Sequence, residues 1–293
     1  MNAVLQISGS AILAIIPALL WIKIFRSQIH ESRRLLLYTF FIGATAVFPI
    51  LFYKYLWQYF PWINAFHYTE GFQADVIGLS HFVSIPVSVV FTFFIVGFIE
   101  EAMKNFAVRV VDDRSTTRNI DDAITMSIVA ALGFSFTENI MYFHAIWIQQ
   151  GMENLLMPFI FRSVFSTFAH IMFSAIFGYY YGISFFAKEY LIANKRTIYW
   201  PKKIQAWFGI QKEEIFSISK WVEGFLIAAT LHAIYNIFLE MNWTFFLVPF
   251  LGIGFFWVNH LLKQKENQKN LGYLVDYTAE EKKESLQSSS QEI

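Results

Sequence analysis

The sequence predicts an all-α protein that crosses a membrane about seven times. Of its 293 residues, 56% are hydrophobic and only 15% are charged, whereas an average soluble domain carries about 25% charged residues. A membrane helix needs about 20 mostly apolar residues. Seven stretches meet this requirement: residues 3–25, 35–57, 79–103, 122–147, 155–187, 220–241 and 243–262.

The basic residues give these stretches an orientation. Lysine and arginine gather at or next to the joints after the first, third and fifth stretches and in the C-terminal tail, with Lys54 and Arg162 as the two exceptions. Cytoplasmic loops of membrane proteins carry an excess of these residues. We therefore expect the N-terminus outside the cell and the C-terminus in the cytoplasm.

Composition also bounds the domains and partners. The chain has no cysteine, which excludes disulfides, thiolate nucleophiles and cysteine zinc sites. Its formal net charge is zero, so we expect no nucleic-acid partner. We expect a single transmembrane bundle over residues 1–262, with its core motifs in 98–240. Residues 188–219 mix basic and aromatic side chains like an interfacial cytoplasmic loop, and residues 263–293 form a polar cytoplasmic tail.

Five polar residues lie deep inside the apolar stretches: Glu100, Glu101, Glu138, His170 and His232. A charge at the bilayer centre costs roughly 2.5–3.5 kcal/mol on insertion scales, so such residues normally face a protein interior and mark a functional site. At about 1.5 Å rise per residue, all but Glu101 were placed roughly 14–27 Å from the cytoplasmic ends of their helices. Four helices could therefore offer polar groups to one shared pocket.

On the third stretch, Lys104 follows both Glu100 and Glu101 by about one helical turn. It can pair with either carboxylate but cannot neutralise both. An ion pair that closes the helix at the interface is the ordinary structural interpretation. The second, unneutralised carboxylate favours a functional one.

Two further stretches carry polar residues at helical spacing. Glu138 and Tyr142 share one helix face, so that Tyr142 could donate a hydrogen bond to Glu138, and Asn139 flanks them. His232 and Asn236 share a face in the same way. Taken alone, Glu138 could also be a structural carboxylate with all its hydrogen bonds made, and His232 could be a histidine that bridges two helices.

These residue types suit hydrolysis of an amide. A carboxylate paired with histidine can deprotonate water, and histidine with asparagine can stabilise an oxyanion, so the reaction needs no metal in principle. The same groups could instead bind zinc, which accepts nitrogen and oxygen ligands. The sequence has no HExxH motif, and Gly133-Phe134-Ser135 lacks the second glycine of a serine nucleophile turn.

At these positions the sequence resembles the PrsW family of intramembrane proteases, which is distantly similar to the CAAX prenyl endopeptidases and the Abi group. The resemblance covers about residues 98–240. It is carried by Glu100-Glu101-x-x-Lys104, Gly133-Phe134-x-x-x-Glu138-Asn139-x-x-Tyr142, His170 with Ser174, Gly178 and Gly182, and His232-x-x-x-Asn236. The resemblance implies a multipass protease of the bacterial cell membrane that cleaves membrane-anchored proteins, in the founding case an anti-sigma factor. The family has been labelled both metal-dependent and glutamic.

Together these observations predict an intramembrane endopeptidase with Glu100 as the general base. The other predicted roles are charge tuning by Glu101 and Lys104, water orientation by His170 and Glu138, oxyanion binding by His232 and Asn236, and support from Asn139 and Tyr142. No cofactor is favoured. Zinc is the alternative, with Glu100, Glu138, His170 and His232 as its ligands.

The predicted partners are a membrane-anchored protein substrate and the lipid bilayer. Two functions of other classes stay open at this point. Intramembrane glutamates and histidines also build the relays of proton- or ion-coupled transporters. A non-catalytic membrane scaffold with the same fold is the other alternative.

Overall fold

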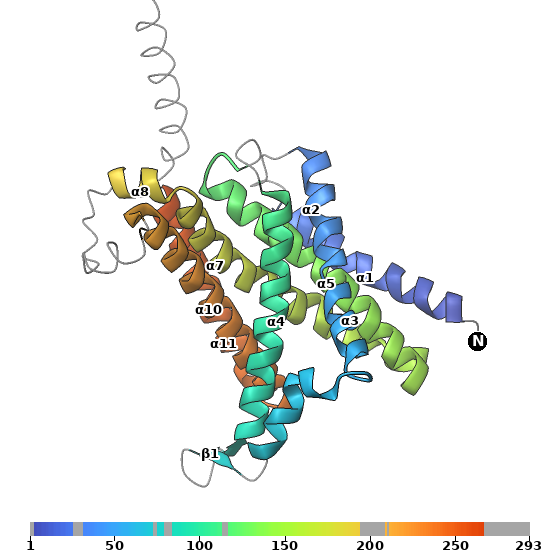
Figure 1. The fold of residues 1–293 in the computed structure, drawn as a ribbon. Coiled ribbons are helices and arrows are strands. Elements are labelled where there is room, and N and C mark those ends of the chain that lie inside the picture. Colours follow the sequence, from blue (N-terminus) through green and yellow to red (C-terminus); the bar gives the residue numbers. More distant parts are fainter. Residues whose placement is uncertain are drawn as a thin grey trace, which may run out of the picture.

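A computed structural model describes residues 3–25, 32–72, 75–78, 84–112, 117–193, 209 and 211–266. Helices dominate the described part of the chain (Figure 1). The α-helices are α1 (Ala3–Phe25), α2 (Arg33–Thr45), α3 (Phe48–Leu56), α4 (Val87–Val111), α5 (Ile120–Gln150), α6 (Leu156–Phe161), α7 (Thr167–Phe185), α8 (Ala187–Ala193), α10 (Lys212–Glu240) and α11 (Thr244–Glu266).

Short elements connect these helices. Three are 3-10 turns, η2 (Pro61–Ile63), η3 (Ala65–Phe72) and η5 (Met152–Asn154), and one is a π-helical turn, η6 (Arg162–Ser166). Strands β1 (Val76–Gly78) and β2 (Ser84–Pro86) form an antiparallel hairpin in which Ile77 lies opposite Ile85.

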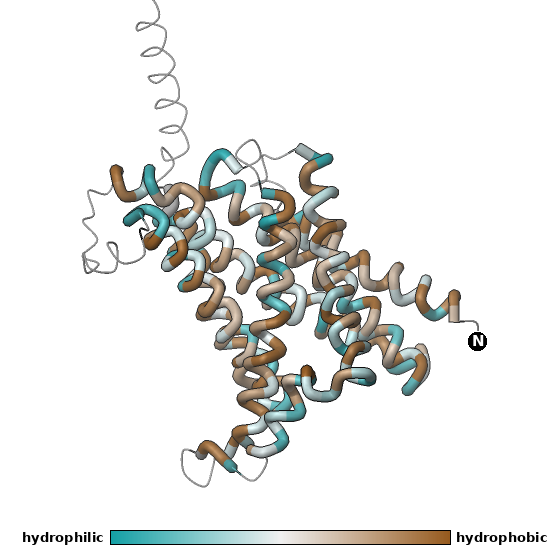
Figure 2. The backbone as a smooth tube through the Cα atoms, in the orientation of Figure 1, coloured by the Kyte–Doolittle hydropathy of each residue, from teal (hydrophilic) through white to brown (hydrophobic). Residues whose placement is uncertain are grey.

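Six helical segments of the described residues are long and apolar enough to cross a membrane: Ala3–Ile24, Arg33–Leu56, Ile120–Gln150, Met152–Phe185, Lys212–Glu240 and Thr244–Gln264. Figure 2 shows hydrophobic residues spread along them. Helix α4, with 25 residues, is the counterpart of the remaining predicted stretch and differs by carrying Glu100, Glu101 and Lys104. The chain is thus an all-α polytopic membrane protein, as predicted. The orientation of its termini stays a prediction.

The predicted boundaries need correction at α4. The stretch was expected to cover residues 79–103, but residues 84–86 belong to β2 and the helix runs from Val87 to Val111. Proline has no backbone N–H to donate and suits a helix start, and Pro86 precedes the first helical residue. Lys104 and Arg109, expected in a joint, therefore lie within the helix.

The expected loop at 188–219 is also shorter than predicted. Helix α8 continues to Ala193 and α10 begins at Lys212, while residues 194–208 and 210 lie outside the described part. Helix α11 extends to Glu266, so the expected tail begins later than residue 263. Residues 267–293 lie outside the described part as well.

Helix α7 lies at the centre of the bundle, with 16 of its 19 residues buried. Small residues bring α5 close to it: a Cβ atom on Gly178 would lie 2.7 Å from the Cα of Ile124, and one on Gly182 would lie 3.0 Å from Ile120. Small residues one helical turn apart are typical of such close helix packing in membranes. Helix α10 packs on another side of α7, where Phe173 contacts the ring of His232.

Candidate active site

Six of the predicted residues meet inside the bundle. Helix α4 supplies three of them, and α5, α7 and α10 supply one each; they are Glu100, Glu101, Lys104, Glu138, His170 and His232. The rings of His170 and His232 lie 5.1 Å apart. These residues come from positions up to 132 apart in the sequence, and their side chains form one connected polar cluster.

Glu101 is fully buried and contacts two donors. Lys104 Nζ lies 2.5 Å and His232 Nδ1 2.9 Å from the same oxygen, Glu101 Oε1. The carboxylate accepts a hydrogen from Nδ1, so the neutral ring of His232 leaves its Nε2 without a hydrogen. That nitrogen lies 3.5 Å from Glu100 Oε2. Glu101 therefore orients His232 toward Glu100.

His170 is held from both sides of its ring. Its Nδ1 lies 2.9 Å from Lys104 Nζ, and its Nε2 lies 2.9 Å from Glu138 Oε2. A lysine ammonium donates hydrogen bonds and accepts none. Beside a charged Lys104, the Nδ1 of His170 is thus an acceptor and the ring hydrogen is on Nε2, facing Glu138.

Arg162 belongs to the cluster, although the sequence analysis did not place it there. Its Nη2 lies 2.9 Å from Glu138 Oε1, and its Nε donates to Asn139 Oδ1 at 2.6 Å. The guanidinium packs over the ring of Tyr142 at 4.5 Å. Tyr142, predicted as a donor to Glu138, thus contributes its ring face to Arg162. The signal that could have found Arg162 is its position as a cation inside an apolar stretch.

The ion pairs distinguish the three carboxylates of the cluster. Glu101 pairs with Lys104 and Glu138 with Arg162. In the described part of the chain, Glu100 Oε2 is buried and has no hydrogen-bond partner. Two of the carboxylates therefore have a cation as their ion-pair partner, whereas Glu100 lies 3.5 Å from the Nε2 of His232.

Three residues of the cluster could hold a metal ion. One ligand atom from each of Glu100, His170 and His232 lies within 4.8 Å of the others. Glu138, the fourth predicted ligand, is not part of this group and instead contacts Arg162 and His170. Asn236 lies one helical turn beyond His232 on α10 and is partly buried.

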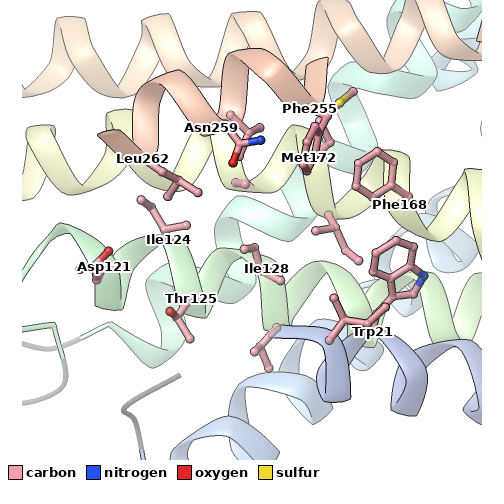
Figure 3. A pocket seen from close by; sticks show the side chains of 15 residues that line it. Trp21, Asp121, Ile124, Thr125, Ile128, Phe168, Met172, Phe255, Asn259 and Leu262 are labelled. Atoms are coloured by element: carbon pink, nitrogen blue, oxygen red, sulfur yellow. The ribbon is translucent and has the colours of Figure 1, made fainter. Parts of the chain in front are cut away.

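A separate cavity lies on another side of α7. It has a volume of about 300 Å³ and is enclosed by α1, α5, α7 and α11 (Figure 3). Most of its lining side chains are apolar, including Ile128, Phe168 and Phe255. None of the six clustered residues lines it.

Comparison with known proteins identifies the family. The sequence model described as "PrsW family intramembrane metalloprotease" matches residues 31–261. The chain belongs to the PrsW family. It is 25% identical over 241 residues to Protease PrsW of Bacillus subtilis (strain 168), an alignment that covers 81% of this chain and 84% of that protein. It is 26% identical over 256 residues to Protease PrsW of Oceanobacillus iheyensis, covering 86% of this chain and 92% of the relative. No solved structure gives a significant match.

Membership of the PrsW family confirms three predictions. The family resemblance was correct, the chain is an intramembrane protease, and it is an integral protein of the bacterial membrane. The catalytic type and the substrate are finer questions, and the geometry of the cluster bears on the first.

Proposed function

We propose that this PrsW-family protein hydrolyses peptide bonds of membrane-anchored proteins, with a zinc ion held by Glu100, His170 and His232. The observation that carries the proposal is the convergence of these three side chains, from α4, α7 and α10, to within 4.8 Å of one another. Regulatory cleavage, with an anti-sigma-factor type of protein as substrate, is the biological role that we infer from the family resemblance.

The residues fit zinc in two respects. The buried Glu100 Oε2 lacks a hydrogen-bond partner in the described part of the chain and is free to act as a ligand. His232 shows the arrangement common behind zinc ligands, in which a carboxylate holds one ring nitrogen and leaves the other for the metal. When bound, zinc polarises a carbonyl group and makes water a stronger nucleophile at neutral pH.

The side chains around the site have separate tasks in this proposal. Glu101 fixes the ring of His232, and Glu138 lies against His170 on the other side of the cluster. Asn236 follows His232 by one turn, so its amide can donate to the oxyanion that forms when water adds to the peptide carbonyl. Glu101, His170 and His232 are buried, and burial strengthens electrostatic contacts between such groups.

One observation favours a second, metal-free mechanism that uses the same residues. Beside a charged Lys104, the Nε2 of His170 carries a hydrogen, and a metal-ligating nitrogen cannot carry one. In this case Glu100 itself takes the proton from water, as the sequence analysis predicted. His170 then acts as a hydrogen-bond donor through Nε2, whereas a metal ligand would offer a lone pair from this nitrogen.

Metal analysis of the purified full-length protein separates the two mechanisms. We expect about one zinc per chain, loss of cleavage on chelation, and recovery when zinc is returned. Glu100→Gln and His232→Ala should both lose zinc and cleavage, while Glu240→Gln, an exposed carboxylate at the end of α10, should change neither. Metal-free protein that cleaves in the presence of chelator supports the glutamate mechanism. Normal cleavage by the Glu100 and His232 variants refutes both.

The substrate can be sought with the same variant. A membrane-anchored protein should accumulate uncut in cells that carry Glu100→Gln and should be processed in cells that carry Glu240→Gln. An anti-sigma factor among the accumulating proteins supports the regulatory role. Accumulation of no membrane protein in Glu100→Gln cells contradicts it.

A further inference from the structure

Arg162 is a buried cation whose guanidinium is engaged on several sides. Only 11% of its side chain is exposed, and its contacts are Glu138 at 2.9 Å, Asn139 at 2.6 Å and the face of Tyr142 at 4.5 Å. All three partners lie on consecutive turns of α5. An unpaired arginine inside a membrane is costly, so these contacts are what retain it there.

The backbone around Arg162 is a π-helical turn, which joins α6 to α7. The backbone N–H of Thr167 bonds to the carbonyl oxygen of Arg162, five residues earlier, and the hydroxyl of Thr167 donates to the same oxygen at 2.9 Å. A π turn adds one residue to a helix and often occurs at functional sites. One residue corresponds to about 100° of rotation. The turn thus sets the direction in which Arg162 leaves the helix.

Glu138 connects Arg162 to His170. One carboxylate oxygen, Oε1, lies against Arg162, and the other, Oε2, lies 2.9 Å from His170 Nε2. Both are ion-pair distances whose angles depart from those of ideal hydrogen bonds. Because a carboxylate is planar and rigid, holding Oε1 restricts the positions that Oε2 can take beside the imidazole.

We propose that Arg162 is a positioning residue for peptide hydrolysis, which acts through Glu138 to hold His170 in its working orientation. The inference rests on the metal-free form of the proposed function, in which the Nε2 hydrogen of His170 faces Glu138. Arg162 itself contacts no reacting atom in this account. Substrate binding should therefore be largely independent of it.

Steady-state kinetics of four variants test this role. Arg162→Gln and Glu138→Gln should each lower kcat by about 10- to 100-fold, the usual effect of removing the partner of an active-site ligand, and change KM less than about 2-fold. The double variant should be no slower than Glu138→Gln alone, because both changes break the same connection. Arg109→Gln is the matched control, since this exposed arginine packs over Trp221 at 4.7 Å, outside the cluster.

Three kinetic results would overturn the proposal. These are an unchanged kcat in Arg162→Gln, a double variant whose loss is the product of the two single losses, or a rise in KM as the main effect. If Arg162→Gln does not fold, Arg162→Lys takes its place. Lysine keeps the charge but cannot reach Glu138 and Asn139 with one rigid fork, so kcat should still fall about 10-fold. A lysine variant as fast as the natural protein refutes the positioning role.

Nuclear magnetic resonance separates this inference from the proposed function. In ¹⁵N-histidine-labelled protein, the ring signals of His170, assigned with a His170→Ala variant, should shift in Arg162→Lys and stay in place in Arg109→Gln. This measurement needs no cleavage, so it decides the connection from Arg162 to His170 even if no peptide is hydrolysed. Unshifted His170 signals in Arg162→Lys contradict the proposal.

Discussion

Two faces of α7 show how differently polar and apolar side chains are used in this bundle. One face presents His170 to Lys104 and Glu138, each at a distance of 2.9 Å. Another face, with Phe168, Ile171, Met172 and Ala175, borders the cavity of about 300 Å³ (Figure 3). This cavity and the charged cluster thus lie at different places around α7. The contacts between charges, and not this cavity, locate the candidate active site.

The neighbouring carboxylates Glu100 and Glu101 on α4 should differ in the same way, one in catalysis and one in stability. Replacing Glu100 should have the largest effect on cleavage. Glu100→Gln should reduce cleavage by about 10²- to 10⁴-fold, the range for loss of an acid–base group. The free energy of unfolding should hardly change, because Glu100 Oε2 has no hydrogen bond to lose in the described part of the chain. Cleavage assays and thermal unfolding in detergent measure the two quantities. A large loss of stability would instead make Glu100 a structural residue.

The buried ion pair one residue away should behave in the opposite way. Lys104→Met removes the cation beside Glu101 and leaves an uncompensated buried carboxylate, which costs about 3–5 kcal/mol. We expect a marked decrease in the unfolding temperature, in contrast to Glu100→Gln. The variant with both Lys104→Met and Glu101→Gln should recover part of this loss, since no unpaired charge remains. Equal stability of Lys104→Met and the natural protein would show that the pair is unimportant for folding.

Two glycines differ in what an added methyl group would meet: a backbone atom at Gly133 and a flexible side chain at Gly254. A Cβ atom on Gly133 would lie 2.0 Å from the carbonyl oxygen of Phe40, so Gly133→Ala should push α2 away from α5 and cost about 1–3 kcal/mol. On Gly254 the Cβ would meet the sulfur of Met172 at 2.0 Å, and this flexible side chain can move. We expect a smaller loss for Gly254→Ala. Unfolding in detergent ranks the two, and the reverse order contradicts the comparison.

The sequence was sufficient for those features that depend on single helices. Apolar length predicted the spans, because each membrane helix must satisfy its own backbone hydrogen bonds. Depth along each helix predicted that Glu100, Glu138, His170 and His232 could meet, since a polar residue in the middle of a span must face protein. The same reasoning indicated that Lys104 could neutralise one carboxylate only, and it pairs with Glu101.

Features that depend on contacts between distant segments could not be predicted from the sequence. The start of α4 was placed too early because Ile85 is as apolar as a helical residue, and its strand conformation depends on pairing with Ile77. The sequence analysis assigned Arg162 no role at the site. Its contact with Glu138 depends on a π turn, which shifts the helix by one residue and leaves no simple periodic signal.

The adjacent residues Ser174 and Ala175 on α7 allow the two faces to be compared one residue apart, and the expected effects are the smallest of this series. Ala175 borders the cavity, so Ala175→Leu should fill part of it, raise the free energy of unfolding by about 0.5–2 kcal/mol and leave cleavage within about 2-fold. Ser174 is buried one turn from His170 and does not line this cavity, so Ser174→Leu should destabilise the bundle and slow cleavage. Unfolding and cleavage assays on the pair check both outcomes. If Ala175→Leu slowed cleavage as much as Ser174→Leu does, the cavity face would be coupled to catalysis, and the separation of volume from chemistry would be wrong.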